Sequence, residues 1–124
     1  FDFPGKYMLE AWDLLLAAYP PEFLGVCYDS GHANMIWGEL ATDVVKAYGN
    51  RLYAVHLHDN DGKNDSHLIP GEGNIRWETV MNLMAESAYD GPLVLELSCH
   101  GDREESLRKA YETGCRLDRM YREA

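Results

Sequence analysis

Residues 51–60 read RLYAVHLHDN, an apolar run that changes to histidine, aspartate and asparagine at its carboxyl end. Two other segments repeat this pattern. Residues 23–29 (FLGVCYD) lead into Ser30-Gly31-His32, and residues 93–98 (LVLELS) carry Glu96. Nearly continuous apolar strands are typical of a parallel sheet that is covered by helices. The three segments therefore predict a parallel sheet with polar side chains gathered at one edge.

Helical periodicity fills the intervals between the expected strands. Apolar spacing predicts helices over residues 6–18, about 38–48 and roughly 76–88. A last helix starts at Asp102, where Asp102 and Glu105 have the Asp-x-x-Glu spacing of a capping box. Residues 59–74, rich in Asp, Asn and Gly, predict a loop. Strand and helix alternation indicates one α/β domain over residues 1–124. Three strands cannot close a barrel, so an open doubly wound sheet and a piece of an eight-stranded barrel both fit.

Composition excludes several classes of protein. The chain has 124 residues, 46% of them hydrophobic, which is enough for a buried core. A net charge of −10 argues against a nucleic-acid surface, and no apolar run is long enough for a membrane span. Three cysteines without a CxxC spacing indicate free thiols and a reducing, cytoplasmic compartment. Since the first residue is Phe1, we expect that the natural N-terminus is absent.

Potential metal ligands lie where the expected strands end. Asp29 and His32 follow the first strand, His56 ends the second, and Glu96 lies in the third. In α/β folds, small molecules and ions bind at the carboxyl ends of the strands. A buried polar side chain without a partner costs about 2–7 kcal/mol of folding free energy, so these residues need a partner. Taken singly, Asp29 could cap a turn, and His32 could cap a helix or lie on the surface. His58 is a better candidate than His56 for a hydrogen-bonded core histidine. Together the residues suit a divalent cation.

The joint pattern resembles the C-terminal half of the xylose isomerase-like barrel superfamily, which includes sugar isomerases, sugar epimerases and inosose dehydratases. The resemblance is carried by Asp29 to His32, His56 to Asn60, Asp65 to Trp77 with its Pro-Gly-Glu-Gly, and Tyr89 to Glu96. It implies an α/β chain that forms strands six to eight, with flanking helices, of a (β/α)8 TIM barrel. It also implies that Asp29, His56 and Glu96 bind one divalent metal, and that Glu96 and His32 are catalytic.

Further expectations follow from the same resemblance. The function is that of a metal-dependent sugar or sugar-phosphate isomerase or epimerase, which moves a proton through an enediolate, with Mn, Mg, Zn or Co as the metal. No organic cofactor is expected. The family's other carboxylate ligand, on the fifth strand, has no match here, so we expect the chain to be inactive alone and to bind metal weakly. We also expect it to form a homo-oligomer or to pair with a complementing N-terminal half. His58 and His100 should lie outside the metal's coordination sphere.

Two other functions stay open. Endonuclease IV, a zinc-dependent AP endonuclease of the same superfamily, uses a similar ligand set, which would include Asp65 and His67 as ligands of a second metal. These two residues could instead contact substrate, and in both cases their Asp-x-His spacing predicts that they point toward one pocket. Taken singly, they could also be ordinary solvated loop residues. The acidic net charge ranks this function second. A non-catalytic fragment that binds metal or assists assembly is the third. If the chain is part of an epimerase, loop 59–74 covers the pocket, and Gly62, Gly71 and Gly73 let it move.

Overall fold

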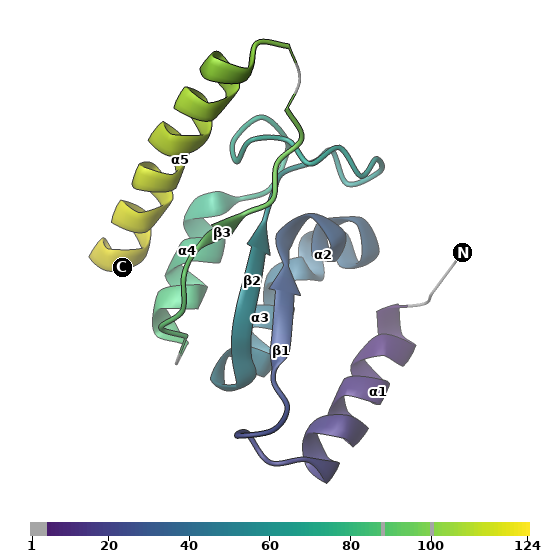
Figure 1. Cartoon of the computed structure of the whole chain (residues 1–124). Coiled ribbons are helices and arrows are strands. Elements are labelled where there is room, and N and C mark those ends of the chain that lie inside the picture. Colours follow the sequence, from purple (N-terminus) through teal and green to yellow (C-terminus); the bar gives the residue numbers. More distant parts are fainter. Residues whose placement is uncertain (1–4, 88, 100) are drawn as a thin grey trace.

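The computed structural model describes residues 5–87, 89–99 and 101–124 (Figure 1). The elements follow in the order helix α1 (Gly5–Ala18), strand β1 (Val26–Asp29), helix α2 (Ser30–Trp37), 3-10 helix η1 (Gly38–Leu40), helix α3 (Ala41–Tyr48), 3-10 helix η2 (Gly49–Arg51), strand β2 (Leu52–Leu57), helix α4 (Trp77–Glu86), strand β3 (Val94–Leu95) and helix α5 (Arg103–Glu123). Among the described helices, none combines the length and apolarity that a membrane span requires.

The strands form one parallel sheet in the order β1-β2-β3, as expected. Its register pairs Asp29 with His56, and His56 with Val94. The amide of Glu96 then donates to the carbonyl of Leu57, which extends the ladder by one residue. Since side chains alternate along a strand, this register puts Asp29, His56 and Glu96 on one face of the sheet.

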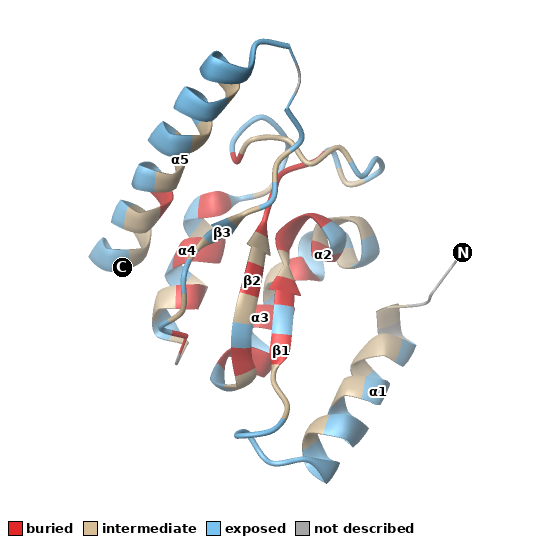
Figure 2. Ribbon diagram, in the orientation of Figure 1, coloured by how far each residue is buried: buried red, intermediate tan, exposed pale blue. Residues whose placement is uncertain are grey.

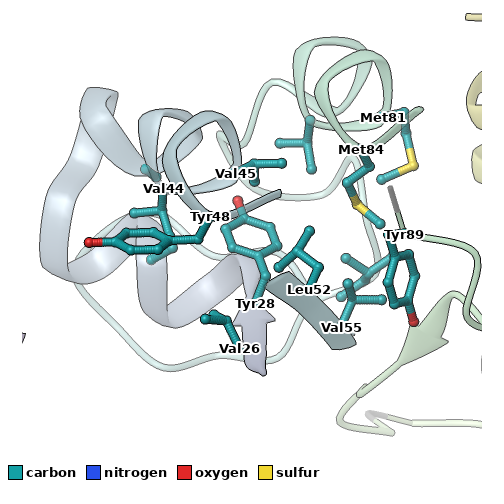
Figure 3. Close-up of a cluster of buried hydrophobic side chains, with 14 of the residues drawn as sticks. Val26, Tyr28, Val44, Val45, Tyr48, Leu52, Val55, Met81, Met84 and Tyr89 are labelled. Carbon is teal, nitrogen blue, oxygen red and sulfur yellow. The ribbon is translucent and has the colours of Figure 1, made fainter. Parts of the chain in front are cut away.

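Helices α3 and α4 cover the opposite face of the sheet, and the hydrophobic core lies between this face and the two helices (Figure 3). Tyr28 and Val55 point from the sheet into this core, where Val45, Met81 and Met84 meet them. Figure 2 shows the result as alternating buried and more exposed residues along β1. The candidate ligands are therefore on the face that these two helices leave open.

Helix α1 is fastened at its C-terminal end by Arg51. The Arg51 guanidinium donates hydrogen bonds to the backbone carbonyls of Leu16, Tyr19 and Leu24. The last carbonyls of a helix lack partners within it, so a cation there satisfies them and opposes the helix dipole. Nearer the start of α1, Trp12 packs edge-on against Tyr48 with the ring centroids 5.3 Å apart.

The structure corrects three predicted elements. The strand expected over 23–29 begins only at Val26, because the amides of Phe23 and Leu24 bond to the carbonyl of Pro20 in a turn. The strand expected over 93–98 spans only Val94–Leu95. Residues 30–37, for which sequence periodicity predicted no element, form helix α2. The three cysteines are free, as expected, and the structure shows them exposed.

Candidate metal centre

The first group of candidate ligands joins the ends of the three strands. His56 Nδ1 lies 3.0 Å from Glu96 Oε2 and 3.8 Å from Asp29 Oδ2. One ligand atom from each residue falls within 4.8 Å of the others. The parallel register produces this proximity, since it aligns Asp29 with His56 and continues the ladder to Glu96. The three residues that the sequence pattern predicted to converge do lie together.

A second group of candidate ligands lies beside the first and includes the loop. His32, His58, Asp65 and His67 each offer an atom within 4.8 Å of the others. Asp65 is the central carboxylate of this group: its Oδ1 is 3.1 Å from His67 Nε2, and its Oδ2 is 3.4 Å from His32 Nε2. Asp65 and His67, which the sequence pattern predicted to share one pocket, therefore face the same cluster as His32.

The backbone around His67 determines which of its ring nitrogens can bind a cation. His67 Nδ1 lies 3.0 Å from the carbonyl oxygen of Glu96, which can only accept, so Nδ1 carries the proton. The Nε2 atom is left with a lone pair, and it faces a carboxylate oxygen of Asp65. Two acceptors at this distance need a cation or a proton between them. His67 also has a φ of 46°, unusual for a residue other than glycine.

Loop 59–74 is held in place by a buried carboxylate and by three asparagines. Asp59 is fully buried and accepts hydrogen bonds from the amides of Gly71 and Ile75. The Asn34 amide group donates to the side-chain oxygens of Asn60 and Asn74, both at 2.8 Å. These bonds fix the path of the loop and, with it, the position of Asp65 and His67.

The glycines expected to give this loop freedom have specific geometric roles in it. Gly62 and Gly71 have φ values of +78° and +103°, in the region that favours glycine. A Cβ on Gly73 would lie 2.3 Å from Asp59 Oδ1, so a larger residue would displace the buried carboxylate. Close approach and turn geometry thus explain these three glycines.

The electrostatics of the site are dominated by carboxylates. In the part of the chain that the structure describes, the side-chain nitrogen atoms close to the carboxylates of Asp29, Asp65 and Glu96 all belong to histidine rings. Burial by itself opposes charge on His32, but the negative charges of Asp29 and Asp65 outweigh it and raise the His32 pKa. Burial likewise opposes charge on Asp65, but hydrogen bonding to His32 and the nearby histidines lower its pKa.

Cys27 lies on the same face of the sheet, two residues before Asp29, and it is a poor candidate for a ligand. Burial, and then the negative charges of Asp29 and Glu96, raise the pKa of its thiol. Neither group of candidate ligands among the described residues includes Cys27. Oxygen and imidazole ligands remain, a set that suits Mn, Mg, Zn or Co.

Two other histidines were expected to lie away from the metal. His58 is fully buried and hydrogen bonded, as its sequence position favoured, and it is not in the group of Asp29, His56 and Glu96. It does contact Asp29, however, with Nε2 2.9 Å from Oδ1, and it belongs to the second group. The sequence signal for this contact is its spacing of two residues from His56. His100 lies outside the described residues.

Comparisons with known proteins place these features in a family. An uncharacterized protein of Sinorhizobium fredii, y4fM, is 40% identical over 89 residues, which cover 71% of this chain and 28% of that protein. An inosose dehydratase of Clostridium tetani is 29% identical over 109 residues, covering 74% of this chain and 36% of the enzyme. A solved structure described as a D-tagatose 3-epimerase-like protein superposes with a TM-score of 0.64 and 32% identity, over 78% of this chain and 34% of that chain.

The chain thus spans between 28% and 36% of the length of these three proteins. The sequence model of the xylose isomerase-like TIM barrel family matches residues 2–117, nearly the whole chain. The parallel sheet and the alternation of strands with helices agree with part of such a barrel. The chain belongs to the xylose isomerase-like TIM barrel family.

Proposed function

We propose that this chain supplies part of the active site of a metal-dependent enzyme that isomerises or epimerises a small sugar or sugar phosphate. The observation that carries the proposal is the convergence of Asp29, His56 and Glu96 at the ends of three parallel strands. Relatives named as an inosose dehydratase and a D-tagatose 3-epimerase-like protein support a polyol or sugar as the substrate class.

In this proposal, Asp29, His56 and Glu96 hold one divalent cation. When bound there, the cation supplies Lewis-acid stabilisation of negative charge on a substrate oxygen. Glu96 accepts the proton from the carbon next to the substrate carbonyl. The electron pair of the broken C–H bond moves toward the carbonyl oxygen and gives an enediolate, and return of the proton to a carbon completes the reaction.

His32 is proposed to orient a hydroxyl group of the substrate. Its Nδ1 lies 2.9 Å from Asp29 Oδ2, and its Nε2 faces Asp65, so the ring spans the two groups of ligands. About half of its side chain is exposed, at 48%, which leaves it open to a bound molecule. Both groups would then contribute to one pocket at the strand ends.

Solvent deuterium exchange tests the proposed proton transfer even when the product of the reaction is not identified. The 124-residue chain, and a longer protein that contains it, are incubated in D₂O with Mn²⁺ or Co²⁺ and with ketohexoses or an inosose. Proton NMR then follows the loss of signal at the carbon next to the carbonyl. In the longer protein, we expect exchange that EDTA abolishes and that Glu96→Gln lowers about 10²–10⁴-fold. The 124-residue chain alone should give no measurable exchange, because the carboxylate expected from the fifth strand is not in it.

The matched control for this experiment is Glu78→Gln, the same chemical change at an exposed position in the first turn of α4. It should leave exchange unchanged. Exchange that persists in Glu96→Gln would exclude Glu96 as the acid or base. Exchange that continues at the same rate in EDTA would exclude a role for the cation.

A second candidate function, metal-dependent hydrolysis of a phosphodiester, rests on the second group of ligands. His32, Asp65 and His67 could hold a further cation beside the first, and several cations suit phosphodiester hydrolysis. The net charge of −10 disfavours binding to a nucleic-acid backbone. Incubation with a duplex that contains one abasic site, with Zn²⁺ present, tests this candidate: cleavage would favour it over the isomerase.

A further inference from the structure

We propose that His58 is a positioning residue that holds the Asp29 carboxylate in the orientation that binds the cation. The proposal rests on the proposed function, because it takes Asp29 as a metal ligand. His58 is itself fully buried, and its Nε2 lies 2.9 Å from Asp29 Oδ1. It acts through Asp29 and does not itself touch the substrate.

The hydrogen-bonding partners of His58 determine its tautomer. A carboxylate oxygen can only accept, so the proton of the ring lies on Nε2 and is donated to Asp29. His58 Nδ1 is buried and has no hydrogen-bond partner among the described residues, which fits a bare lone pair better than an N–H group. Among the described residues, Asp29 is therefore the one hydrogen-bond partner of the His58 ring.

The two oxygens of Asp29 are used differently because of this contact. Oδ1 accepts from His58 Nε2 and from the backbone amide of His32, which is also the N-cap bond of α2. Oδ2 remains for the site, 2.9 Å from His32 Nδ1 and 3.8 Å from His56 Nδ1. With Oδ1 held by two donors, rotation of the carboxylate away from the site would break two hydrogen bonds at once.

The surroundings of His58 fix the ring in turn. Its backbone is clamped by Ser30, whose hydroxyl donates to the His58 carbonyl at 2.8 Å and accepts from the His58 amide at 3.0 Å. One side of the ring fits against Gly31, where a Cβ would lie 2.0 Å from His58 Cε1. The ring also stacks on His67 with centroids 3.8 Å apart and planes within 1° of parallel. These contacts together restrain the position and the plane of the ring.

Metal affinity is the measurement that separates positioning from mere packing. Mn²⁺ and Co²⁺ are titrated by calorimetry into the wild-type chain and into His58→Leu, which keeps similar bulk but donates nothing. We expect affinity about 10–100-fold weaker in His58→Leu, the usual consequence of losing a hydrogen bond that orients a ligand. His58→Gln, which can present an N–H group to Asp29, should restore most of the affinity.

Val45→Ala is the control for lost stability, because Val45 is a buried residue of α3 and lies in the core on the opposite face of the sheet from the candidate ligands. It should lower the unfolding temperature and leave metal affinity unchanged. Equal metal affinities in the wild type and His58→Leu would overturn the inference. So would an affinity loss in His58→Leu that Val45→Ala reproduces.

A measurement on the metal-free wild type keeps the inference testable if His58→Leu fails to fold. Long-range proton–nitrogen NMR should show a proton on His58 Nε2, and a ring whose only proton is on Nδ1 would refute the inference. Intact metal affinity without any deuterium exchange in the longer protein would contradict the proposed reaction and leave the role of His58 standing. A wild-type chain that binds neither metal would refute both proposals.

Discussion

Asp59 shows how one residue can organise the loop beside the site. Its carboxylate is fully buried, yet it accepts four N–H hydrogen bonds, from the amides of Asn60, Gly71 and Ile75 and from the indole of Trp77. A buried charge is tolerated when such donors replace water. Asp59 therefore ties the start of the loop to its end and to the first turn of α4.

Loss of the Trp77 indole donor should destabilise the protein measurably. The Trp77 Nε1 to Asp59 Oδ2 distance is 2.7 Å, and both side chains are buried. We expect Trp77→Phe to lower the free energy of unfolding by about 1.5–3 kcal/mol, since the bond is made to a charged acceptor. Urea unfolding, monitored by circular dichroism, measures this change in the free energy of unfolding.

Trp37→Phe is the matched comparison for this prediction. Trp37 Nε1 is buried and has no hydrogen-bond partner among the described residues, so the same deletion removes no hydrogen bond there. Its cost should be smaller, limited to lost packing. Equal costs for the two variants would show that the bond to Asp59 contributes nothing.

Among the elements, α5 is the longest described helix, and its start is stabilised by a local hydrogen bond. Asp102 is its N-cap: the Asp102 side chain accepts a hydrogen bond from the amide of Glu105 at 2.9 Å. This is the cap that the sequence predicted from the Asp-x-x-Glu spacing. Leu117 is fully buried beneath the helix and anchors it to the core.

Removal of this cap should loosen the start of α5. We expect Asp102→Ala to lower the free energy of unfolding by about 1 kcal/mol, because the amides of the first turn lose their acceptor. Asp102→Asn keeps an acceptor oxygen and should cost much less. Thermal unfolding of both variants compares their stabilities. If Asp102→Asn is as unstable as Asp102→Ala, loss of the cap is excluded as the cause.

The ion pairs along α5 give the helix a predictable dependence on pH. Hydrogen bonding to Lys109 lowers the pKa of Glu105, and hydrogen bonding to Arg122 lowers that of Asp118. Each carboxylate therefore stabilises the folded chain at pH values above its ordinary pKa, which is 4.5 for Glu105 and 3.8 for Asp118. This stabilisation is lost as the pH falls through the lowered pKa of the folded state.

The double variant Glu105→Gln and Asp118→Asn should therefore flatten the acid side of the stability profile. All four side chains are largely exposed, so the effect should be modest and weaker in high salt. Urea midpoints measured from neutral to acidic pH, with and without added salt, give the comparison. A steeper acid-side loss in the double variant would contradict the assignment.

The whole molecule leaves two edges of its sheet and much apolar surface open. In the described structure β1 and β3 each pair only with β2. Large apolar side chains are exposed on α1, before β1 and on α5: Leu14 is 74% exposed, Phe23 72%, Leu107 71% and Tyr111 75%. Helices α1 and α5 flank opposite edges of the sheet (Figure 1). Open edges and apolar patches of this kind favour association.

We accordingly expect the 124-residue chain to associate at micromolar concentration. Sedimentation velocity should give a mass above the 14.1 kDa of one chain. The double variant Leu107→Lys and Tyr111→Lys should shift the equilibrium toward the monomer if α5 is in the interface, and Leu14→Lys makes the same test for α1. A folded species that stays at 14.1 kDa would show that the open edges need no partner.

Much of the fold and of the site could be predicted from local sequence. Strand and helix alternation, the loop over 59–74 and the cap at Asp102 were predicted, because each depends on spacing along a few residues. Convergence of Asp29, His56 and Glu96 was also predicted, since carboxyl ends of parallel strands share one edge. Membership of the barrel family was inferred from the same residues. Assignment to strands six to eight stays a prediction.

Other features depend on contacts between distant residues. Helix α2 was missed because Gly31 and Asn34 are weak helix formers; it begins where Asp29 caps it and packs on the sheet. The hydrogen bond between His58 and Asp29 joins residues 29 positions apart. The His58 ring fits there because Gly31 has no Cβ and because the ring stacks on His67. Periodicity assigns a side chain to a face, but hydrogen-bond partners and burial are fixed only when strands, helix and loop pack together.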